Sequence, residues 1–344
     1  MSKKQTTGLI VAVVLFVVTG VVSVISNALS AKLTEGTDSS SDSFTAMMEE
    51  MYGTGEFSVD DLPMDEDYIA VVPVRGTIQA STGSSGFASS TEAYDHDLLM
   101  SYVNALMESD NNKGIIIKLD TPGGTVYEAD ELYLKLKEYK EKTGRPIWAY
   151  MESMCCSGGV YISSIADEQY ANRNTTTGSI GVIMSSYNMA GLYEKLGIEE
   201  VNIVSSKNKA MGSAAKPLTP EQKAIYQSIV DEAYEQFVGI VAEGRDMSVT
   251  DVKKLADGRI YTATQAVENG LIDGMMTSEA FDEYVKEESG VDEFYELEDS
   301  TDMFGQLFGA YASTKEKSEA EVLVDLMNSL GSGVPMYYAE PYGK

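Results

Sequence analysis

Residues 147–167 read IWAYMESMCCSGGVYISSIAD, and this stretch decides the fold class. Its first part, Ile147–Met151, is apolar and contains aromatic and branched side chains, which predicts a buried strand. The glycine pair after Ser157, followed by apolar residues, predicts a sharp turn into a helix. A buried strand that turns at once into a helix is typical of a sheet flanked by helices.

The sequence on either side continues this alternation of strands and helices. Strands are predicted at Tyr68–Val74, Gly114–Leu119, Ile180–Met184 and Val201–Val204. Helices are predicted at Asp97–Met107, Val126–Thr143, 219–242, 248–256, 264–269 and 318–330. The third of these opens with TPEQ, a capping sequence with proline in the first turn. The predicted fold class is α/β, with a parallel β-sheet flanked by helices.

The amino-terminal part contains an apolar stretch with the length of a membrane span. Lys3 and Lys4 precede an uncharged stretch from Gln5 to Ala31, which is long enough to cross a bilayer as a helix. The preceding positive charge predicts a cytoplasmic amino terminus and an extracytoplasmic remainder. A cleaved signal peptide, with processing near Ala28, is the alternative.

Composition excludes several functions. The formal net charge of −29 argues against binding of nucleic acid, and a single histidine, His96, cannot form a His-rich zinc site. The two cysteines, Cys155 and Cys156, are adjacent and form no C-x-x-C pair. A disulfide between neighbours would be strained, so we expect two thiols, no metal and no other cofactor.

Two glycine-containing turns carry the candidate chemistry. Ser157 at a strand-to-helix turn exposes its hydroxyl beside unpaired backbone N–H groups, which suit the oxyanion of an acyl-transfer reaction. The segment Thr121–Gly124 (TPGG) ends another strand, where α/β sheets place their sites. Taken alone, the first is equally a helix cap and the second a tight turn.

A serine nucleophile also needs a general base. His96 lies in a polar stretch and is a poor candidate, which leaves carboxylates, tyrosines and lysines. A lysine serves only when burial or nearby charge lowers its pKa. Lys207, Lys209 and Lys216 lie between a predicted strand and a predicted helix, and the local sequence alone indicates surface residues.

Six motifs between Tyr68 and Asp273 follow one another in a recognisable order. They are RGTI at 75–78, LDTPGG at 119–124, SGGVYIS at 157–163, TTGSIGV at 176–182, KNKAMGS at 207–213 and DGRIYTATQAVENGLID at 257–273. Together they resemble the signal peptide peptidase A family of Ser-Lys peptidases, which have the ClpP/crotonase-like fold. One such domain after one anchor is similar to the shorter, single-domain form.

The resemblance implies roles for five residues. Ser157 matches the nucleophile and Lys209 the general base. Ser179 matches the residue whose hydroxyl orients that lysine. Gly124 and Gly158 match the donors of the oxyanion hole through their backbone N–H groups.

The main departure from the family directly precedes the nucleophile. Family members usually have small residues such as Ala where this chain has Cys155 and Cys156. Because a thiolate is a better nucleophile than serine, Cys156 is an alternative. The position of the glycine pair favours Ser157, and both thiols would then pack beneath the site as small apolar groups.

The resemblance also implies a function. It implies a membrane-anchored, extracytoplasmic peptidase that degrades remnant signal peptides or similar apolar peptides, as a homo-oligomer whose dyads can form across subunit boundaries. A groove beside Ser157 would bind an extended peptide by main-chain pairing. The alternatives are a crotonase-like enzyme acting on acyl thioesters and a catalytically inactive membrane scaffold.

Four parts are expected along the chain. They are a cytoplasmic stub and anchor (1–31), an acidic tether (32–67), the peptidase domain (68–278) and an acidic segment with a helix and an extended tail (279–344). The tail ends in GVPMYYAEPYGK at 333–344. This extended sequence suits the groove of its own or a neighbouring subunit, and a frayed terminus is the alternative.

Overall fold

The computed structural model describes residues 57–81, 94–297 and 336–338. The expected anchor at 1–31, the first part of the tether and the expected helix at 318–330 lie outside the described residues. Within the described ranges, no helix has the length and apolar character needed to cross a bilayer.

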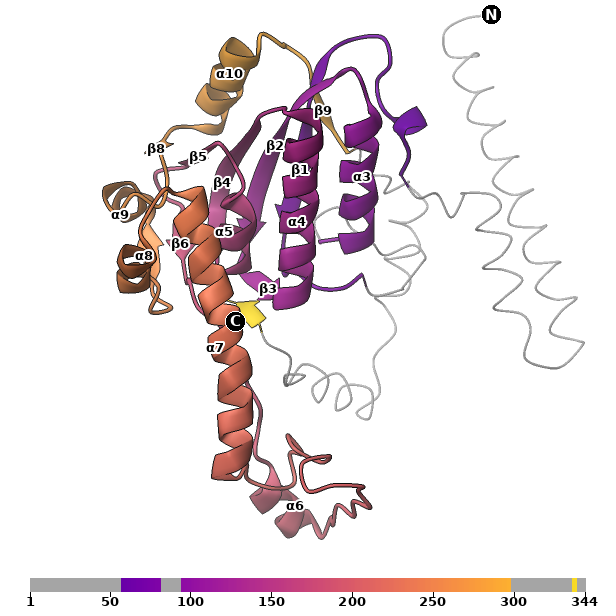
Figure 1. Ribbon diagram of the computed structural model, residues 1–344, viewed down its shortest axis with the longest axis vertical. Coiled ribbons are helices and arrows are strands. Elements are labelled where there is room, and N and C mark those ends of the chain that lie inside the picture. The colour runs from indigo at the N-terminus through magenta and orange to yellow at the C-terminus, as the bar shows by residue number, and fades with distance from the viewer. Residues whose placement is uncertain (1–56, 82–93, 298–335, 339–344) are drawn as a thin grey trace, which may run out of the picture. The chain divides into compact units, whose positions relative to one another are not determined.

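The central feature is a mostly parallel sheet of eight strands in the path β7-β6-β4-β2-β1-β9, with β5 between β4 and β8 (Figure 1). Its strands are β1 (Tyr68–Arg75), β2 (Asn112–Thr121), β4 (Ile147–Cys156), β5 (Glu168–Ala171), β6 (Thr176–Gly178), β7 (Ile260–Thr262), β8 (Gly274–Met275) and β9 (Phe294–Glu296). Only the pair β6–β7 is antiparallel. A second sheet pairs β3 (Gly123–Thr125) with β10 (Met336–Tyr338) in antiparallel orientation.

Helices cover both faces of the sheet. One face packs against α3 (His96–Glu108), α4 (Val126–Thr143), α5 (Gly158–Ser163) and the second half of α7 (Pro220–Gly244). The other packs against α10 (Ser278–Ser289). The remaining helices are η1 (Val59–Asp61), α6 (Ala190–Leu196), α8 (Val249–Leu255) and α9 (Ala263–Glu268).

Strand β1 shows why the central strands are apolar throughout. Ala70 and Val72 point into the core under α3 and α4, whereas Ile69 and Val71 point into the core under α10. Successive side chains of a strand point to opposite faces, so a strand covered on both faces needs a continuous apolar run. The predicted α/β class is therefore confirmed.

The predicted capping sequence before α7 is also confirmed. Thr219 Oγ1 accepts a hydrogen bond from the Gln222 N–H at 3.2 Å, and the Gln222 side chain accepts one from the Thr219 N–H at 3.1 Å. These contacts satisfy donors that the first turn leaves unpaired. They define where α7 begins.

Two predicted strands are wrong. Residues 180–184 contribute only an isolated bridge between Ile183 and Met336, and residues 201–204 have no regular structure and are exposed. The same region holds what we call the arm, residues 186–232, which contains α6 and the first half of α7 and extends beyond the sheet (Figure 1). The apolar side chains of residues 201–204 lie on this arm and not in the core, whereas Ile180 is buried in the core and Val182 packs against it without forming a strand.

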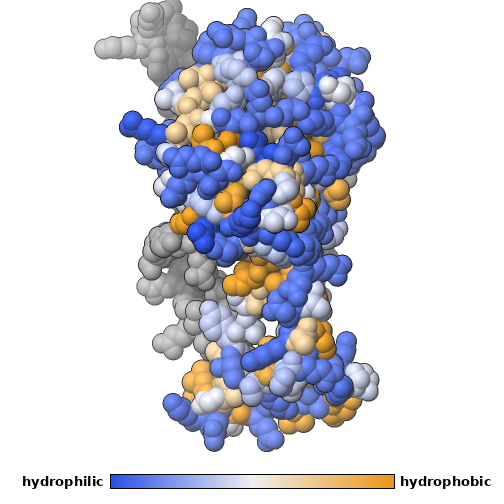
Figure 2. All heavy atoms as spheres, turned by 60° about the vertical axis from the view of Figure 1, so that its left-hand side comes forward, coloured by the Kyte–Doolittle hydropathy of each residue, from blue (hydrophilic) through white to orange (hydrophobic). Residues whose placement is uncertain are grey.

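The arm carries many exposed apolar side chains. Figure 2 shows apolar atoms gathered at its end. Those with large exposed surfaces are Tyr187, Leu192, Leu196, Ile198, Val201, Ile203 and Val204. Exposed apolar side chains that gather at one end of a domain are candidates for an interaction surface.

Two leucines of α4 provide a test of the core. Leu136 is fully buried, whereas Leu134 on the same helix is 52% exposed. Leu136→Ala is expected to lower the free energy of unfolding by about 2–5 kcal/mol because it leaves a cavity, and Leu134→Ala by less than about 0.5 kcal/mol. Chemical denaturation followed by circular dichroism measures both, and equal effects would contradict this packing.

Candidate active site

Ser157 lies at the turn between β4 and α5 in a strained conformation. Its φ is 54° and its ψ is −110°, a region that costs a non-glycine residue about 1–3 kcal/mol. Its N–H donates to the Gly178 carbonyl at 2.8 Å. Its hydroxyl is buried and, among the described residues, has no hydrogen-bond partner. The turn therefore holds an unpaired hydroxyl in a fixed position.

The TPGG turn brings a second backbone segment against Ser157. The Ile78 N–H donates to the Gly123 carbonyl, and the Thr125 N–H donates to the Ile78 carbonyl, each at 2.9 Å. Because backbone groups alternate in direction along a strand, the N–H of Gly124 faces away from Ile78. A Cβ on Gly124 would lie 1.8 Å from the Ile78 carbonyl oxygen. Only glycine allows this approach.

The two backbone amides expected to act together lie side by side. A Cβ built on Gly158 would lie 3.4 Å from the Gly124 nitrogen. A Cβ built on Gly123 would lie 2.7 Å from the Gly158 nitrogen and 2.9 Å from the Ser157 Cβ. The structure thus brings Ser157, Gly124 and Gly158 together. This arrangement can place two N–H donors beside a carbonyl that Ser157 attacks.

The chain's own tail lies in the groove beside these residues. In β10, Tyr337 pairs with Gly124 and Tyr338 with Gly123. On its other side, the Met336 N–H and carbonyl bond to the carbonyl and N–H of Ile183, both at 3.0 Å. The expectation that the tail occupies the groove is confirmed for residues 336–338. The groove accepts an extended segment as a middle strand.

Ser179 lies next to the nucleophile, as its motif predicts. It is 8% exposed and has a φ of 53°, and its N–H donates to the Arg259 carbonyl at 2.7 Å. The preceding residue, Gly178, is the acceptor for the Ser157 N–H. A hydroxyl at this position can contact a base that approaches Ser157.

Lys209 is not brought to Ser157 within one chain. It lies exposed on the arm, and its amino group has no ion pair among the described residues, whereas Lys207 pairs with Glu221 at 2.8 Å. Lys216 also lies on the arm. A single chain therefore brings Ser157 together with the Gly124 and Gly158 amides, and its lysine candidates lie on the arm.

Both cysteines are buried thiols. Cys155 and Cys156 are free and fully buried. The Cys156 thiol contacts the Thr176 carbonyl at 3.6 Å. Burial raises the pKa of Cys155 and raises the pKa of Cys156 to about 12. Neither forms a thiolate near neutral pH, which removes the case for Cys156 as nucleophile.

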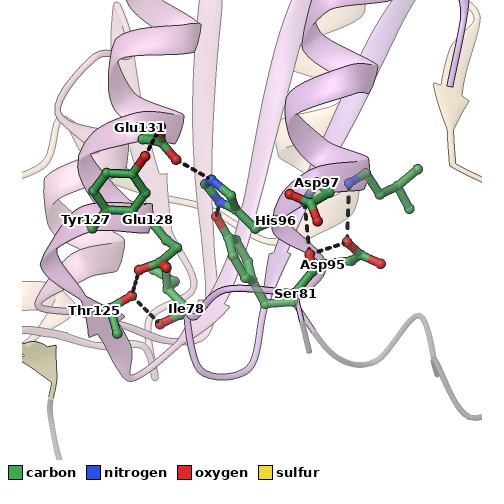
Figure 3. A network of polar contacts seen from close by, with 11 residues as sticks. Ile78, Ser81, Asp95, His96, Asp97, Thr125, Tyr127, Glu128 and Glu131 are labelled. Carbon is green, nitrogen blue, oxygen red and sulfur yellow. Dashed lines mark hydrogen bonds and ion pairs between the residues drawn. The ribbon is translucent and has the colours of Figure 1, made fainter. Parts of the chain in front are cut away.

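His96 has a structural environment away from the nucleophile. Its ring nitrogens lie 2.8 Å from the Tyr94 hydroxyl and 3.0 Å from the Glu131 carboxylate (Figure 3). In the same network, the Thr125 hydroxyl contacts Glu128 and the Ile78 carbonyl. Both ring nitrogens of His96 are therefore hydrogen-bonded, and its contact with Glu131 links α3 to α4.

The sequence did not point to the side-chain pocket beneath the groove. Tyr161 of α5 and Phe237 of α7 are fully buried and enclose the Tyr337 ring, with ring centroids 4.9 and 4.7 Å away. The sequence placed both residues only within segments predicted to be helical. No local signal links residues so far apart in the chain.

Known proteins are similar to this chain in sequence. The model of peptidase family S49 matches residues 139–292. A protein of Enterococcus faecium, named as a signal peptide peptidase SppA, is 37% identical over 258 residues that cover 74% of each chain. The chain belongs to the signal peptide peptidase A family.

Two further relatives extend this comparison. A protein of Synechocystis sp. named as a protease is 39% identical over 186 residues, which cover 54% of this chain and 66% of the relative. The chloroplastic serine protease SPPA of Arabidopsis thaliana is 31% identical over 210 residues, which cover 61% of this chain and 30% of the relative. As a member of this family, the chain is a serine protease.

A glycine substitution tests the close approach in the site. Gly124→Ala would force a methyl group against Ile78, so we expect kcat/KM for a peptide substrate to fall about 100-fold or more as the donor moves. The control is Gly239→Ala in α7, where a Cβ meets nothing within 4 Å. Equal activity of the two variants would contradict the assigned geometry.

The raised pKa values of the two thiols also predict their reactivity. Because both stay protonated at pH 8, the folded protease should resist alkylation by iodoacetamide. After unfolding in guanidinium chloride, both cysteines should be alkylated within the reaction time used for the folded protein. Mass spectrometry counts the modified cysteines, and rapid alkylation of Cys156 in the folded protein would restore it as a candidate nucleophile.

Proposed function

We propose that this protease is a membrane-anchored serine endopeptidase with the ClpP/crotonase-like fold, which degrades remnant signal peptides or similar apolar peptides at the extracytoplasmic face. One observation carries the proposal. The Ser157 hydroxyl is buried and has no hydrogen-bond partner in the described part of the chain, and it lies beside the Gly124 and Gly158 amides in a groove that holds an extended segment.

In the proposed reaction Ser157 is the nucleophile and Lys209 the general base. A neutral Lys209 amine takes the hydroxyl proton, and the Ser157 oxygen attacks the peptide carbonyl carbon. The Gly124 and Gly158 N–H groups stabilise the oxyanion. The lysine then gives its proton to the leaving amine, and water hydrolyses the acyl-enzyme by the same route. Ser179 orients the lysine.

We infer that Lys209 reaches Ser157 from a neighbouring copy of the chain. Within one chain Lys209 is exposed on the arm, whereas a lysine serves as a general base when it is buried beside its nucleophile. Burial of the exposed apolar side chains of the same arm against another protein surface would be favourable. Docking the arm of one copy onto the site of the next would bury both the patch and the lysine. Such head-to-tail contacts form a ring when the rotation between successive copies closes.

The sequence supports the membrane location and the class of substrate. Residues 5–31 are uncharged and largely apolar, and two lysines precede them. An anchored domain would meet apolar peptides released in the bilayer. The paired tail favours a peptide over a thioester, because the groove bonds the backbone of its occupant on both sides.

Co-expression of two inactive variants tests the shared site. Ser157→Ala and Lys209→Ala should each abolish peptide cleavage, and Ser157→Ala should also abolish labelling by a fluorophosphonate. Expressed together, the two variants should form mixed oligomers in which some sites join an intact Ser157 to an intact Lys209. We expect partial recovery of cleavage, measured with a fluorogenic peptide.

Lys207→Ala is the matched control, because Lys207 lies on the same loop but pairs with Glu221. This variant should stay active alone. An active Lys209→Ala enzyme would refute the lysine as base. Failure to recover activity in mixed oligomers that have formed would place the dyad within one chain.

A further inference from the structure

Strand β4 contains a bulge just before Ser157. In the pairing of β2 with β4, Leu119 lies opposite Met151 and Thr121 lies opposite Cys155. Between these two pairs β2 has one residue, whereas β4 has three, residues 152–154. Extra residues of this kind bend a strand and change the direction of the residues that follow. Because their number is even, Met151 and Cys155 still point into the same core.

The bulge lies where β4 changes its neighbour in the sheet. Before the bulge, residues 148–151 pair with β5. From the last residue of the bulge onward, residues 154–156 pair with β6. Strand β6 ends at Gly178, whose carbonyl accepts the hydrogen bond from the Ser157 N–H. The bulge therefore directs the end of β4 toward the strand that holds the backbone of Ser157.

The side chain of Asp120 holds the last residue of the bulge. Asp120 Oδ1 accepts a hydrogen bond from the Met154 N–H at 2.9 Å. The Thr175 hydroxyl lies 3.0 Å from the Met151 carbonyl oxygen and also contacts the Glu152 carbonyl. A bulge takes main-chain groups out of the regular ladder, and a buried N–H without a partner is costly. The Asp120 carboxylate supplies the acceptor for this N–H.

The main chain of Asp120 begins the TPGG turn. Its carbonyl accepts a hydrogen bond from the Gly76 N–H at 2.9 Å. The hydroxyl of the next residue, Thr121, donates to the Gly76 carbonyl at 2.5 Å and accepts from the Gly123 N–H at 3.0 Å. Asp120 thus belongs to the turn with the first oxyanion donor, and its side chain bonds the strand with the nucleophile. One residue links the two halves of the site.

We propose that Asp120 is a positioning residue, which acts through the bulge to fix Ser157 Oγ relative to the Gly124 N–H. The proposal rests on the proposed function, because it takes Ser157 as the nucleophile and Gly124 as an oxyanion donor. Since the partner of Asp120 is a neutral N–H, the role requires an acceptor atom at the position of Oδ1 and not a negative charge. A displacement of about 1 Å in a catalytic group can lower a rate about 100-fold.

An aspartate at the other end of the same strand provides a matched control. Asp167 Oδ2 accepts a hydrogen bond from the Ile147 N–H at 2.9 Å, at the start of β4. Asp120→Ala should lower kcat for a fluorogenic peptide about 10- to 100-fold, slow fluorophosphonate labelling equally and change KM little. Asp167→Ala removes a contact of the same kind and should leave kcat unchanged. Circular dichroism identifies a temperature at which both variants are folded, and equal kcat values there would overturn the proposal.

Two further substitutions decide the question even where Asp120→Ala does not fold. Asp120→Asn keeps the Oδ1 acceptor and removes the charge, so it should retain most of the wild-type kcat. Asp120→Glu keeps the charge but is one methylene longer, which displaces the acceptor, so kcat should fall. A loss of activity in Asp120→Asn, or a wild-type kcat in Asp120→Glu, would assign the effect to charge and overturn the positioning role.

The outcomes separate this inference from the proposed function. A wild-type enzyme that neither cleaves peptides nor takes the fluorophosphonate label at Ser157 would refute the proposed function. A wild-type enzyme that does both, while folded Asp120→Ala and Asp167→Ala have the same kcat, would refute only the role of Asp120.

Discussion

The site depends on the contact of two backbone turns at one edge of the sheet. Strands β2 and β4 run parallel, with Thr121 opposite Cys155, so the turns that follow them meet. At this contact there is no room for side chains at Gly123 and Gly124. Two backbone amides can then face the same carbonyl, and the positive φ of Ser157 lets its side chain join them. The candidate site therefore depends first on main-chain packing.

Much of the sheet could be predicted because its strands are buried on both faces. The apolar runs beginning at Tyr68, Gly114 and Ile147 lie in β1, β2 and β4, and α4 has the bounds Val126–Thr143 that its pattern predicted. The prediction of a strand at Val201–Val204 is wrong because this apolar run lies on the exposed arm. Periodicity identifies apolar side chains but does not say whether they are covered by the same chain.

Helix α10 and strand β9 were not predicted, for the opposite reason. The sequence predicted only an acidic segment there, yet Phe281 and Val285, one helical turn apart, pack into the core under α10. Strand β9 pairs with β1 and extends the sheet. A short strand among carboxylates has too few apolar residues to be recognised, and its pairing with the first strand is a long-range event.

The candidate site also has residues that could be predicted from the sequence and residues that could not. Ser157, Gly124, Gly158 and Ser179 follow from motifs that local turns hold in place, and the chain brings them together. Lys209 lies exposed on the arm, and one chain does not bring it to Ser157. The pocket of Tyr161 and Phe237 depends on how α5 and α7 cross, which no spacing in the sequence encodes.

The hydrogen bonding on both sides of the groove limits which polypeptides can enter it. Met336 is bonded through its backbone to Ile183, and Tyr337 faces Gly124 on the opposite side. An occupant must therefore offer free main-chain groups on both edges at successive residues, and a proline at either position would lack a donor. In helices and in the inner strands of intact sheets, the backbone N–H and C=O groups are already hydrogen-bonded. The enzyme can thus work among correctly folded neighbours and spare them, since conformation limits entry before any side chain is recognised.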